Sequence, residues 1–414
     1  MNSIELMCPA GDFKSLSAAI KAGADSVYFG VGELNMRSNA ANFSTDDLEE
    51  IVEKCKENGV KSYLTLNTVM YNEDLESMEK VCDRAKEAGL DAVIASDIAV
   101  IKYCNKIGLE VHMSTQANIS NIEAVKFYSE FADTVVLARE LSLQQIKEIC
   151  GQVEEQGIKG PNGENLKIEV FAHGALCVAV SGKCYMSLAQ YDSSANRGQC
   201  LQPCRREYEI KDKQTGDELV LGNNYVMSPK DLCTIGMIDK LVESGAKVFK
   251  IEGRARGPEY VYTVVKTYKE AIKSVEDGSY SEEKIDKWRE KLGEVFNRGL
   301  WEGGYYMGDK TEMWSGEYGT KATKKKVQVG KVTHYFPEPG VGVVKVLSEG
   351  FEKGDQLLFT GKTTGALYQE VNELRKDDEK VEKAEKKDLV TVKVKERVRE
   401  NDKVYVIKDR EEKR

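Results

Sequence analysis

Five short segments repeat one pattern and decide the fold: AGADSVYFG (residues 22–30), NGVKSYLTLN (58–67), AGLDAVIAS (88–96), IGLEVHMST (107–115) and SGAKVFKIEG (244–253). Each starts at the end of an amphipathic stretch, passes through a glycine, and enters a short apolar run. Glycine commonly stops a helix because it adopts the left-handed backbone conformation without steric cost. The pattern therefore predicts buried parallel strands, each preceded by a helix.

The same pattern extends over the first three hundred residues. Strands are expected at residues 4–7, 26–29, 62–66, 92–95, 110–113, 134–137, 167–171 and 247–251. Helices are expected at residues 13–22, 45–58, 75–88, 98–107, 122–131, 142–152 and 232–244. Eight β-then-α units predict an α/β fold, a closed (β/α)8 TIM-like barrel. A doubly wound open sheet is the rival, but the glycine-rich turn it normally carries after an early strand is missing.

Two regions depart from this pattern. An insertion at about residues 175–235 replaces the short connection before the last strand, and it holds five of the ten cysteines. After a polar helix expected at residues 281–296, the sequence GTKATKKK (319–326) marks a boundary. From there apolar residues alternate with a period of two between frequent turns, which predicts a small all-β barrel or sandwich. We therefore expect one domain over residues 1–320 and another over 321–414.

Composition agrees with a chain of two or three domains. The 414 residues are 41% hydrophobic and 31% charged, with a net charge of −9. Residues 321–414 carry 23 basic and 18 acidic side chains, so this segment is at +5 and the remainder at −14. No overall positive field attracts nucleic acid or anionic lipid, so any contact with a polyanion must be local.

Membrane and secretory signals are missing from the sequence. It has no run of about 18 apolar residues, and its start, MNSIELMCPAG, lacks a basic segment and places Glu5 where a signal peptide would be apolar. We therefore expect a cytoplasmic protein without a membrane contact. In that compartment ten cysteines predict metal or redox roles rather than a disulfide framework.

Polar residues follow the predicted strands, where barrel enzymes carry their sites. Two of the three histidines, His112 and His173, come at strand ends, and so do Arg139, Glu252 and Arg254. Some polar residues at these positions only cap the following helix, and Asp97 and Ser142 are expected to do so.

The cysteines of the insertion form the sharpest chemical motif. Their spacing is Cys177-x6-Cys184-x15-Cys200-x3-Cys204-x28-Cys233. Four thiolates suit a structural zinc ion or an iron–sulfur cluster, and wide, irregular spacing favours the cluster because zinc ligands usually come in close pairs. Free thiols without a metal are the simpler alternative. Cys177 and His173 could also be imagined as the nucleophile and base of a hydrolase, although they lie close together on one segment.

The stretch EVFAHGALCVAVSGKCYMS (169–187) closely resembles the hallmark segment of the collagenase-like peptidase U32 family. So do SANRGQCLQPCRREY (194–208), SPKDL (228–232), KIEGRARGPEYV (250–261) and CPAGDFKSLSAAIKAGADSVYFG (8–30). The segment VGKVTHYFPEPGVGVVKVLSEGFEKGDQLLFTG (329–361) is similar to the family's small C-terminal β-barrel. The resemblance covers nearly the whole chain.

The resemblance implies one of several activities. The family is named for collagenase activity, and its other branches include prephenate-dependent tRNA wobble-uridine hydroxylation proteins, a ribosomal RNA cytidine hydroxylase and oxygen-independent ubiquinone-synthesis proteins. The last group carries a 4Fe-4S cluster on four cysteines. The matching cysteines here are Cys177, Cys184, Cys200 and Cys233, with Cys204 as an extra thiol. The large C-terminal extension of the ribosomal RNA branch is missing, which favours tRNA.

These considerations lead to one expected function, an RNA hydroxylase that acts on tRNA wobble uridine with a 4Fe-4S cluster and prephenate. Arginine is the natural partner of a dicarboxylate, and Arg139 or Arg254 is expected to bind it, followed by Arg37 and Arg197. His112 and His173 are expected to move protons, with Glu252 as their charge partner.

Three further questions stay open at this point. The basic link at 321–326 could hold RNA phosphates or be a solvated linker. The site could hold zinc or no metal in place of the cluster. A peptidase and a non-catalytic role beside a protein partner in a biosynthetic complex are the alternative functions.

Overall fold

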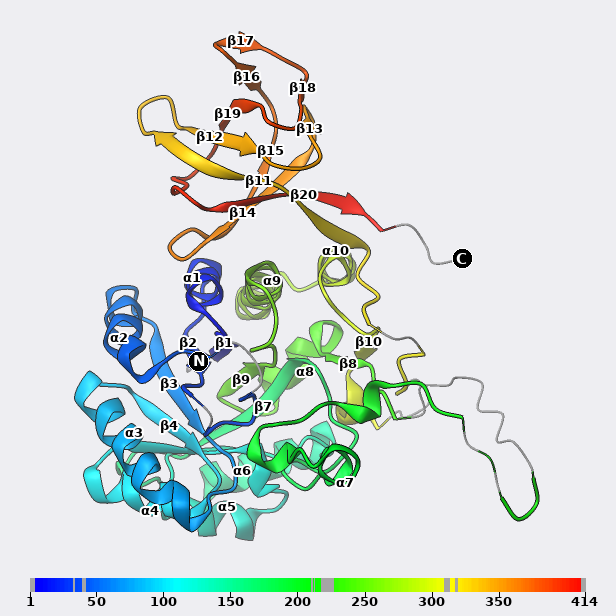
Figure 1. Ribbon diagram of the computed structural model, residues 1–414. Helices are drawn as coiled ribbons and strands as arrows, with labels where there is room; N and C mark the ends of the chain where they lie inside the picture. Colours follow the sequence, from blue (N-terminus) through cyan, green and yellow to red (C-terminus); the bar gives the residue numbers. More distant parts are fainter. Residues whose placement is uncertain are drawn as a thin grey trace.

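The computed structural model describes residues 4–32, 34–38, 42–209, 211, 213–216, 227–308, 313–316 and 319–410. Its larger part is a closed barrel of eight parallel strands (Figure 1). These are β1 (Glu5–Pro9), β2 (Ser26–Phe29), β3 (Lys61–Leu66), β4 (Ala92–Ala95), β5 (Glu110–Met113), β6 (Thr134–Val136), β7 (Lys167–Gly174) and β9 (Val248–Ile251). Neighbours in the chain pair in parallel, and β9 closes the ring because it pairs with both β7 and β1. The TIM-like barrel predicted from the sequence is confirmed.

Helices between the strands form the outer layer. They are α1 (Phe13–Ala22), α2 (Leu48–Glu57), α3 (Leu75–Ala88), α4 (Ile98–Ile107), α5 (Ile122–Ser129), α6 (Leu143–Glu155), α8 (Ile238–Glu243) and α9 (Pro258–Glu276). Gly23 and Gly89 end their helices at φ of +92° and +76°, as the repeated pattern predicts. Asp97 and Ser142 accept hydrogen bonds from the backbone N–H groups of Ala99 and Gln145, so both are N-caps as expected.

Side chains fill the barrel interior. Met7, Tyr28, Tyr63, Ala92, Ile94 and Val248 form a separate buried cluster there. Because the lumen is packed rather than open, a ligand site has room only at an end of the barrel.

The long connection from β7 to β9 differs in part from its prediction. It contains the short helix α7 (Met186–Tyr191). Near the end of the connection a strand, β8 (Asp231–Cys233), precedes α8 at the place where the sequence pattern predicts the start of a helix. β8 pairs antiparallel with the end of β7, and β10 (Leu300–Glu302) pairs with β8. The pairing of β8 with β7 thus replaces the start of the helix expected at residues 232–244, and α8 forms only its later part. Residues 217–226 of the insertion lie outside the described residues.

The last ninety residues form a second, all-β unit. Its strands are β11 (Lys324–Phe336), β12 (Val341–Val346), β13 (Phe351–Glu352), β14 (Gln356–Gly361), β15 (Gly365–Glu370), β16 (Leu374–Lys376), β17 (Glu379–Lys380), β18 (Lys383–Ala384), β19 (Leu389–Lys393) and β20 (Lys403–Asp409). Eight of them make an antiparallel sheet in the order β15-β14-β20-β11-β12-β19-β16-β17. The sheet encloses a valine-rich core of its own.

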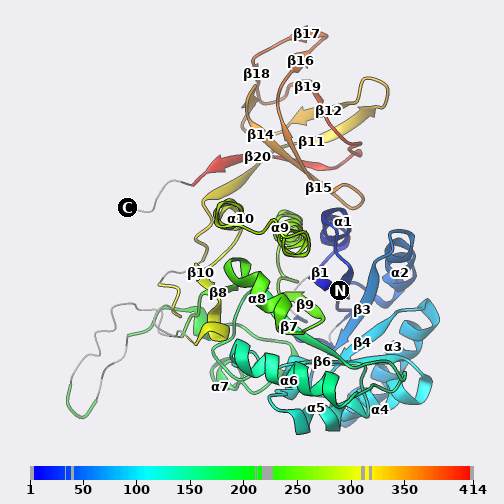
Figure 2. The same ribbon diagram turned by 180° about the vertical axis from the view of Figure 1, so that it is seen from behind.

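Helices α1, α9 and α10 (Glu282–Glu294) lie between the barrel and this unit (Figures 1 and 2). The turn between β14 and β15 rests on α1, where Ser17 Oγ donates a 2.5 Å hydrogen bond to the carbonyl oxygen of Lys362. Gly365 has φ of +67°, and a Cβ there would lie 2.7 Å from the backbone nitrogen of Ala18. The expected polar helix at 281–296 is α10, which buries Trp288 and so belongs to the packed structure.

No helix among the described residues combines the length and the apolar character that crossing a membrane needs.

Candidate functional site

The insertion lies across the carboxyl-terminal end of the barrel. The hydroxyl of Ser181 accepts a 2.9 Å hydrogen bond from Arg139, which follows β6. The backbone carbonyl of Ser181 accepts a 3.0 Å bond from Asn118, which follows β5. Further along, the carbonyl of Asn196 accepts a 3.2 Å bond from the backbone N–H of Val69, which follows β3. A Cβ on Gly198 would lie 2.1 Å from the carbonyl oxygen of Asn35, so only glycine allows the insertion to approach the loop after β2. These contacts make the insertion a cover over the barrel mouth.

A cavity of about 270 Å3 lies between the barrel and this cover. Seven cationic side chains line it: Arg37, Arg139, Arg205, Lys250, Arg254, Arg256 and Arg298. Glu252 is the one carboxylate among its described lining residues. Three of the seven cations form salt bridges, Arg37 with Glu252, Lys250 with Glu169 and Arg298 with Asp231. The other four have no salt bridge among the described residues, so the mouth of the barrel is positive although the chain as a whole is at −9.

Arg254 illustrates how these charges are held. Its side chain is 5% exposed, and Nη1 donates hydrogen bonds of 3.0 Å to Asn35 Oδ1 and 2.9 Å to Thr65 Oγ1. Burial lowers the pKa of Arg254 to about 10. Both hydrogen-bond partners are neutral, so the charge is removed from water without direct contact with a carboxylate of the described residues. An unpaired buried cation is costly, and an incoming anion would offset that cost.

Arg205 and Arg139 also donate hydrogen bonds to neutral partners. Arg205 donates to the carbonyl oxygens of Pro229 at 2.6 Å and Leu176 at 2.5 Å, and burial lowers its pKa to about 10. Arg139 bonds the Ser181 hydroxyl and lies 5.8 Å from the centre of the Phe171 ring. No salt bridge joins either arginine to a carboxylate of the described residues. The mouth is thus a set of oriented cationic donors that suits a carboxylate or phosphate.

The carboxylate of Glu252 pairs with Arg37 rather than with a histidine, the partner expected from the sequence. Its carboxylate lies 3.0 Å from Arg37 Nη2 and accepts a 3.0 Å bond from the Tyr28 hydroxyl. Burial alone would raise the pKa of Glu252, but Arg37 and Arg254 hold that pKa below its usual value. It is therefore a fixed anion that orients Arg37, and the expected pairing with a histidine is corrected.

Neither histidine lies at the mouth. His112 Nε2 is 3.0 Å from Glu110 Oε1, and its ring packs against Tyr63, deeper in the barrel than Ser114, which does line the cavity. His173 Nδ1 is 3.3 Å from the hydroxyl of Tyr268 on α9, outside the barrel. The physical reason is an irregularity in β7: the register with β9 shifts between Phe171 and His173. Phe171 faces the cavity and His173 does not. The expected placement of both histidines at the mouth is therefore corrected.

The buried His173 makes the fold sensitive to acid. Burial lowers its pKa from 6.5 to about 3, so the ring of His173 stays neutral in the folded chain. As pH falls below 6.5 the unfolded chain takes up a proton that the folded chain does not, and stability is lost until the pH reaches about 3. At about pH 5 this loss is about 2 kcal/mol. We expect His173→Gln to lose less stability than the unmodified protein between pH 7 and 5, as measured by urea unfolding; equal losses would contradict the assignment.

Four thiols of the insertion gather on one side of the cavity. Cys177, Cys200 and Cys204 line it, and Cys177 is exposed while Cys184, Cys200 and Cys204 are half-buried. Burial raises the pKa of Cys204 to about 11; Arg205 opposes that rise, and the neighbouring thiols add to it. Those neighbours are Cys177, Cys184 and Cys200, so the four side chains share one environment.

Cys233 lies elsewhere, contrary to the expected ligand set. It is fully buried in β8 opposite His173, and its sulfur is 3.9 Å from the Tyr268 hydroxyl. Burial raises its pKa, with Glu302 and not another thiol as the next cause. The structure places Cys204, rather than Cys233, with the other three cysteines. The reason is the short strand β8, which turns Cys233 away from the mouth.

The type and number of these donors suit a four-cysteine cluster. Among the described residues no three His, Cys, Asp or Glu side chains converge closely enough to hold a single metal ion. A single zinc ion needs all four sulfurs about 2.3 Å from one point. In a 4Fe-4S cluster each cysteine binds a different iron, so a cluster does not require the four sulfurs to converge on one point.

Arg197 has a structural partner. It forms a salt bridge with Asp74 and lies 4.2 Å from the centre of the Tyr71 ring, and its Nη1 donates a 3.0 Å bond to the carbonyl of Val69. It does not line the cavity. Of the four predicted arginines, the structure brings Arg37, Arg139 and Arg254 together and leaves Arg197 to fix the insertion to the loop after β3.

The sequence reasoning missed a buried ion pair below the cavity. Lys250 Nζ is 2.7 Å from Glu169 Oε1, and both side chains are within the barrel. Lys250 also faces the rings of Tyr28 and Phe171 and lines the cavity floor. The signal was present: a lysine and a glutamate each interrupt an otherwise apolar parallel strand, where charged residues are rare.

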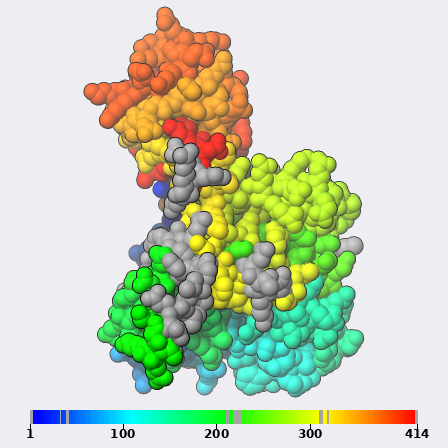
Figure 3. Space-filling view, turned by 90° about the vertical axis from the view of Figure 1, so that its right-hand side faces the viewer, coloured from blue at the N-terminus to red at the C-terminus, as the bar shows by residue number. Residues whose placement is uncertain are grey.

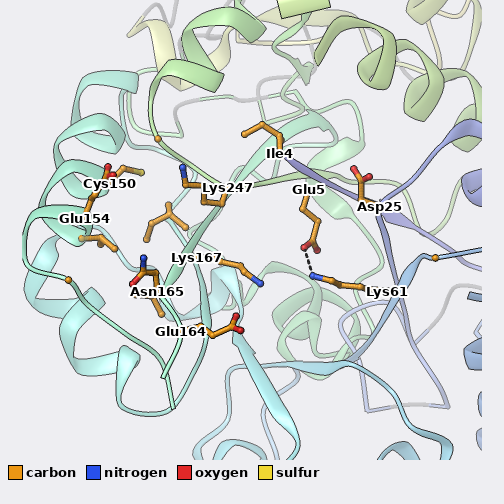
Figure 4. A pocket seen from close by; sticks show the side chains of 16 residues that line it. Ile4, Glu5, Asp25, Lys61, Cys150, Glu154, Glu164, Asn165, Lys167 and Lys247 are labelled. Atoms are coloured by element: carbon orange, nitrogen blue, oxygen red, sulfur yellow. Dashed lines mark hydrogen bonds and ion pairs between the residues drawn. The ribbon is translucent and has the colours of Figure 1, made fainter. Parts of the chain in front are cut away.

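A cavity of about 600 Å3 opens at the opposite end of the barrel (Figure 4). It is lined by the starts of strands and by α6, with Lys61 paired to Glu5 at 3.1 Å and with Lys167 and Lys247 nearby. Charges of both signs line this cavity, and it lies at the amino-terminal end, where TIM barrels build stability rather than catalysis. The smaller cavity at the mouth is therefore the candidate site.

The fold and the site together define a TIM-barrel protein with a cation-lined mouth beside a thiol-rich cover. Residues 11–316 match the family model described as Peptidase family U32, and the chain belongs to that family.

Several curated proteins are similar along most of their length. A collagenase of Porphyromonas gingivalis is 54% identical over 413 residues and spans 100% of both chains. An uncharacterized protease of Methanocaldococcus jannaschii is 41% identical over 414 residues, 99% of each chain. The tRNA hydroxylation protein P1 of Bacillus subtilis is 35% identical over 372 residues, 86% of this chain and 83% of that one. The resemblance drawn from the motifs is confirmed, and the names of the relatives divide between two activities.

Proposed function

We propose that this chain is an RNA-modifying hydroxylase whose target is a tRNA wobble uridine and whose cosubstrate is prephenate. The observation that carries the proposal is the cavity at the barrel mouth, where seven cationic side chains and three thiols face one space. A relative with 35% identity is named a tRNA hydroxylation protein. An RNA substrate and a dicarboxylate are both anionic, which is the chemistry that such a lining recognises.

In this proposal Cys177, Cys184, Cys200 and Cys204 hold a 4Fe-4S cluster. A bound cluster supplies one-electron chemistry, which side-chain acids and bases do not provide. Arg205 and Arg37 are the charges beside these thiols: burial raises the pKa of Cys204 and of Cys200, and Arg205 and Arg37, respectively, oppose that rise. A positive charge beside a thiol favours the thiolate form that a metal needs.

The chain's own residues bind and orient the two substrates. Arg254 and Arg139 offer donors to the carboxylates of the cosubstrate, while Glu252 fixes Arg37 at 3.0 Å. The insertion covers the cavity through its contacts with the loops after β2, β3, β5 and β6. Charge interactions are stronger in a partly enclosed site of this kind than in open water.

The basic link is not needed for this binding. Three of its four lysines lie in β11, where Lys324 pairs with Asp409 at 2.5 Å and Lys326 pairs with Glu259 at 2.7 Å. A paired lysine contributes less to phosphate binding than a free one. We therefore place the phosphate contacts at the barrel mouth.

A peptidase is the second candidate, because the relative with 54% identity is named a collagenase. Cysteine nucleophiles need a base within hydrogen-bond reach. The chain has three histidines; His112 and His173 are buried away from the cavity, and His334 is in β11 of the C-terminal unit. The Cys177–His173 pair considered from the sequence is therefore not supported.

The test compares tRNA from a strain that lacks this gene with tRNA from the same strain expressing the native chain or Arg254→Met. We expect mass spectrometry of nucleosides to show that 5-hydroxyuridine and its derivatives disappear, return with the native chain, and stay missing with the variant. Unchanged nucleosides in the deletion strain, together with gelatin cleavage by the purified native protein, would instead establish the peptidase.

A further inference from the structure

Large apolar side chains are exposed on the outside of the insertion. Among the described residues, fourteen such side chains are exposed, and five of them belong to this segment. They are Val180, Tyr185, Leu188, Tyr191 and Leu201. Val69 and Tyr71 add two more from the loop after β3, which the insertion contacts directly. Exposed apolar residues that gather in this way mark a surface with a partner.

Two of the three aromatic members of this surface, Tyr71 and Tyr191, lie beside arginines. Arg197 lies 4.2 Å from the centre of the Tyr71 ring, and Arg206 lies 4.8 Å from that of Tyr191 and bonds its hydroxyl. Tyr185 is 69% exposed, the most of any large apolar side chain in the described residues. Flat rings and guanidinium planes are the groups on which unpaired bases stack.

This surface and the thiols belong to the same segment of the chain. Tyr185 directly follows Cys184, and Leu201 directly follows Cys200, which lines the cavity. In Figure 3 the insertion (green) lies at the opposite end of the visible face from the C-terminal unit (orange and red). A chain of nucleotides that enters the cavity from outside would therefore pass over these tyrosines and not over the C-terminal sheet.

We propose that the outer face of the insertion is a stacking platform for single-stranded RNA, with Tyr185 and Tyr191 holding the bases that flank the modified nucleotide. This inference rests on the proposed function. The cationic mouth contacts phosphates, and the tyrosines contact bases, which only a single strand exposes on its faces. Duplex RNA keeps its bases stacked inside the helix and cannot use the platform.

The experiment measures binding of a fluorescein-labelled single-stranded oligouridylate and of an RNA duplex of the same length by fluorescence anisotropy. We expect Tyr185→Ala and Tyr191→Ala each to weaken binding of the single strand about thirtyfold, the middle of the range for base–aromatic stacking. Tyr185→Phe keeps the ring and should bind like the native chain. Because no phosphate contact is lost, the dependence of affinity on salt should be unchanged in all of these variants.

Phe127→Ala is the matched control, because Phe127 is an exposed aromatic residue on α5. Thermal unfolding verifies that every variant is folded. Native affinity of both alanine variants for the single strand would overturn the platform and leave the proposed function standing. Failure of the native chain to bind either RNA would overturn both. Loss of gelatin binding in the alanine variants with RNA binding intact would assign the surface to a polypeptide and overturn the inference.

Discussion

Cys204→Ala is expected to abolish the iron and sulfide content of anaerobically purified protein, whereas Cys233→Ala should retain both. The reason is position: the environment of Cys204 includes Cys177, Cys184 and Cys200, while Cys233 is buried in β8 beside Tyr268. A cluster that loses one of four cysteine ligands is not expected to survive purification. The measurement is colorimetric iron and sulfide analysis together with the absorbance at about 400 nm that cysteine-ligated clusters show.

The two variants control for each other because both remove one thiol. Cys233 is fully buried and Cys204 half-buried, so Cys233→Ala should be the more destabilising replacement. A cluster lost from Cys204→Ala alone cannot therefore be attributed to weakened folding. Loss from Cys233→Ala with retention in Cys204→Ala would return the ligand set to the one that the family resemblance implies. Zinc, or no metal, in the native protein would remove the cluster from the proposal.

The barrel could be predicted because its signals are local. Each repeat carries a helix end, a glycine stop and an apolar strand within about ten residues, and Gly23 and Gly89 show the expected backbone. β8 was missed because three residues between a long insertion and a helix carry no periodicity of their own. Its formation depends on the end of β7, which lies more than fifty residues away in the chain.

The candidate site could be predicted only in part, and the division has a physical cause. Arginines after strand ends face the mouth whichever way the strand is turned, because they follow the last paired residue. A histidine inside a strand depends on register, and the irregularity between Phe171 and His173 was not visible in the sequence. The choice between Cys204 and Cys233 likewise depends on which segment folds back onto the mouth.

Arg254→Met is expected to weaken prephenate binding strongly while leaving the fold as stable as before. Removing one partner of a buried charge pair typically costs 2–5 kcal/mol, so affinity should fall by about thirtyfold or more. Stability should hold because each partner of Arg254 keeps another contact. Asn35 Oδ1 still accepts from the backbone N–H of Arg37 at 3.1 Å, and Thr65 Oγ1 still donates to the carbonyl of Phe29 at 2.9 Å.

Isothermal titration with prephenate and urea unfolding measure the two halves of this expectation. Arg84→Met is the matched control, because it removes the same charge from a partly exposed arginine on α3 that pairs with Glu87 outside the cavity. This variant should therefore bind prephenate like the native chain. Arg254 is buried without a carboxylate in direct contact, so methionine relieves a desolvation cost in the free protein and removes the gain in the complex. Equal loss of affinity in both variants would show that general positive charge, not the placement of Arg254, holds the ligand. Native affinity in Arg254→Met would exclude this arginine from the site.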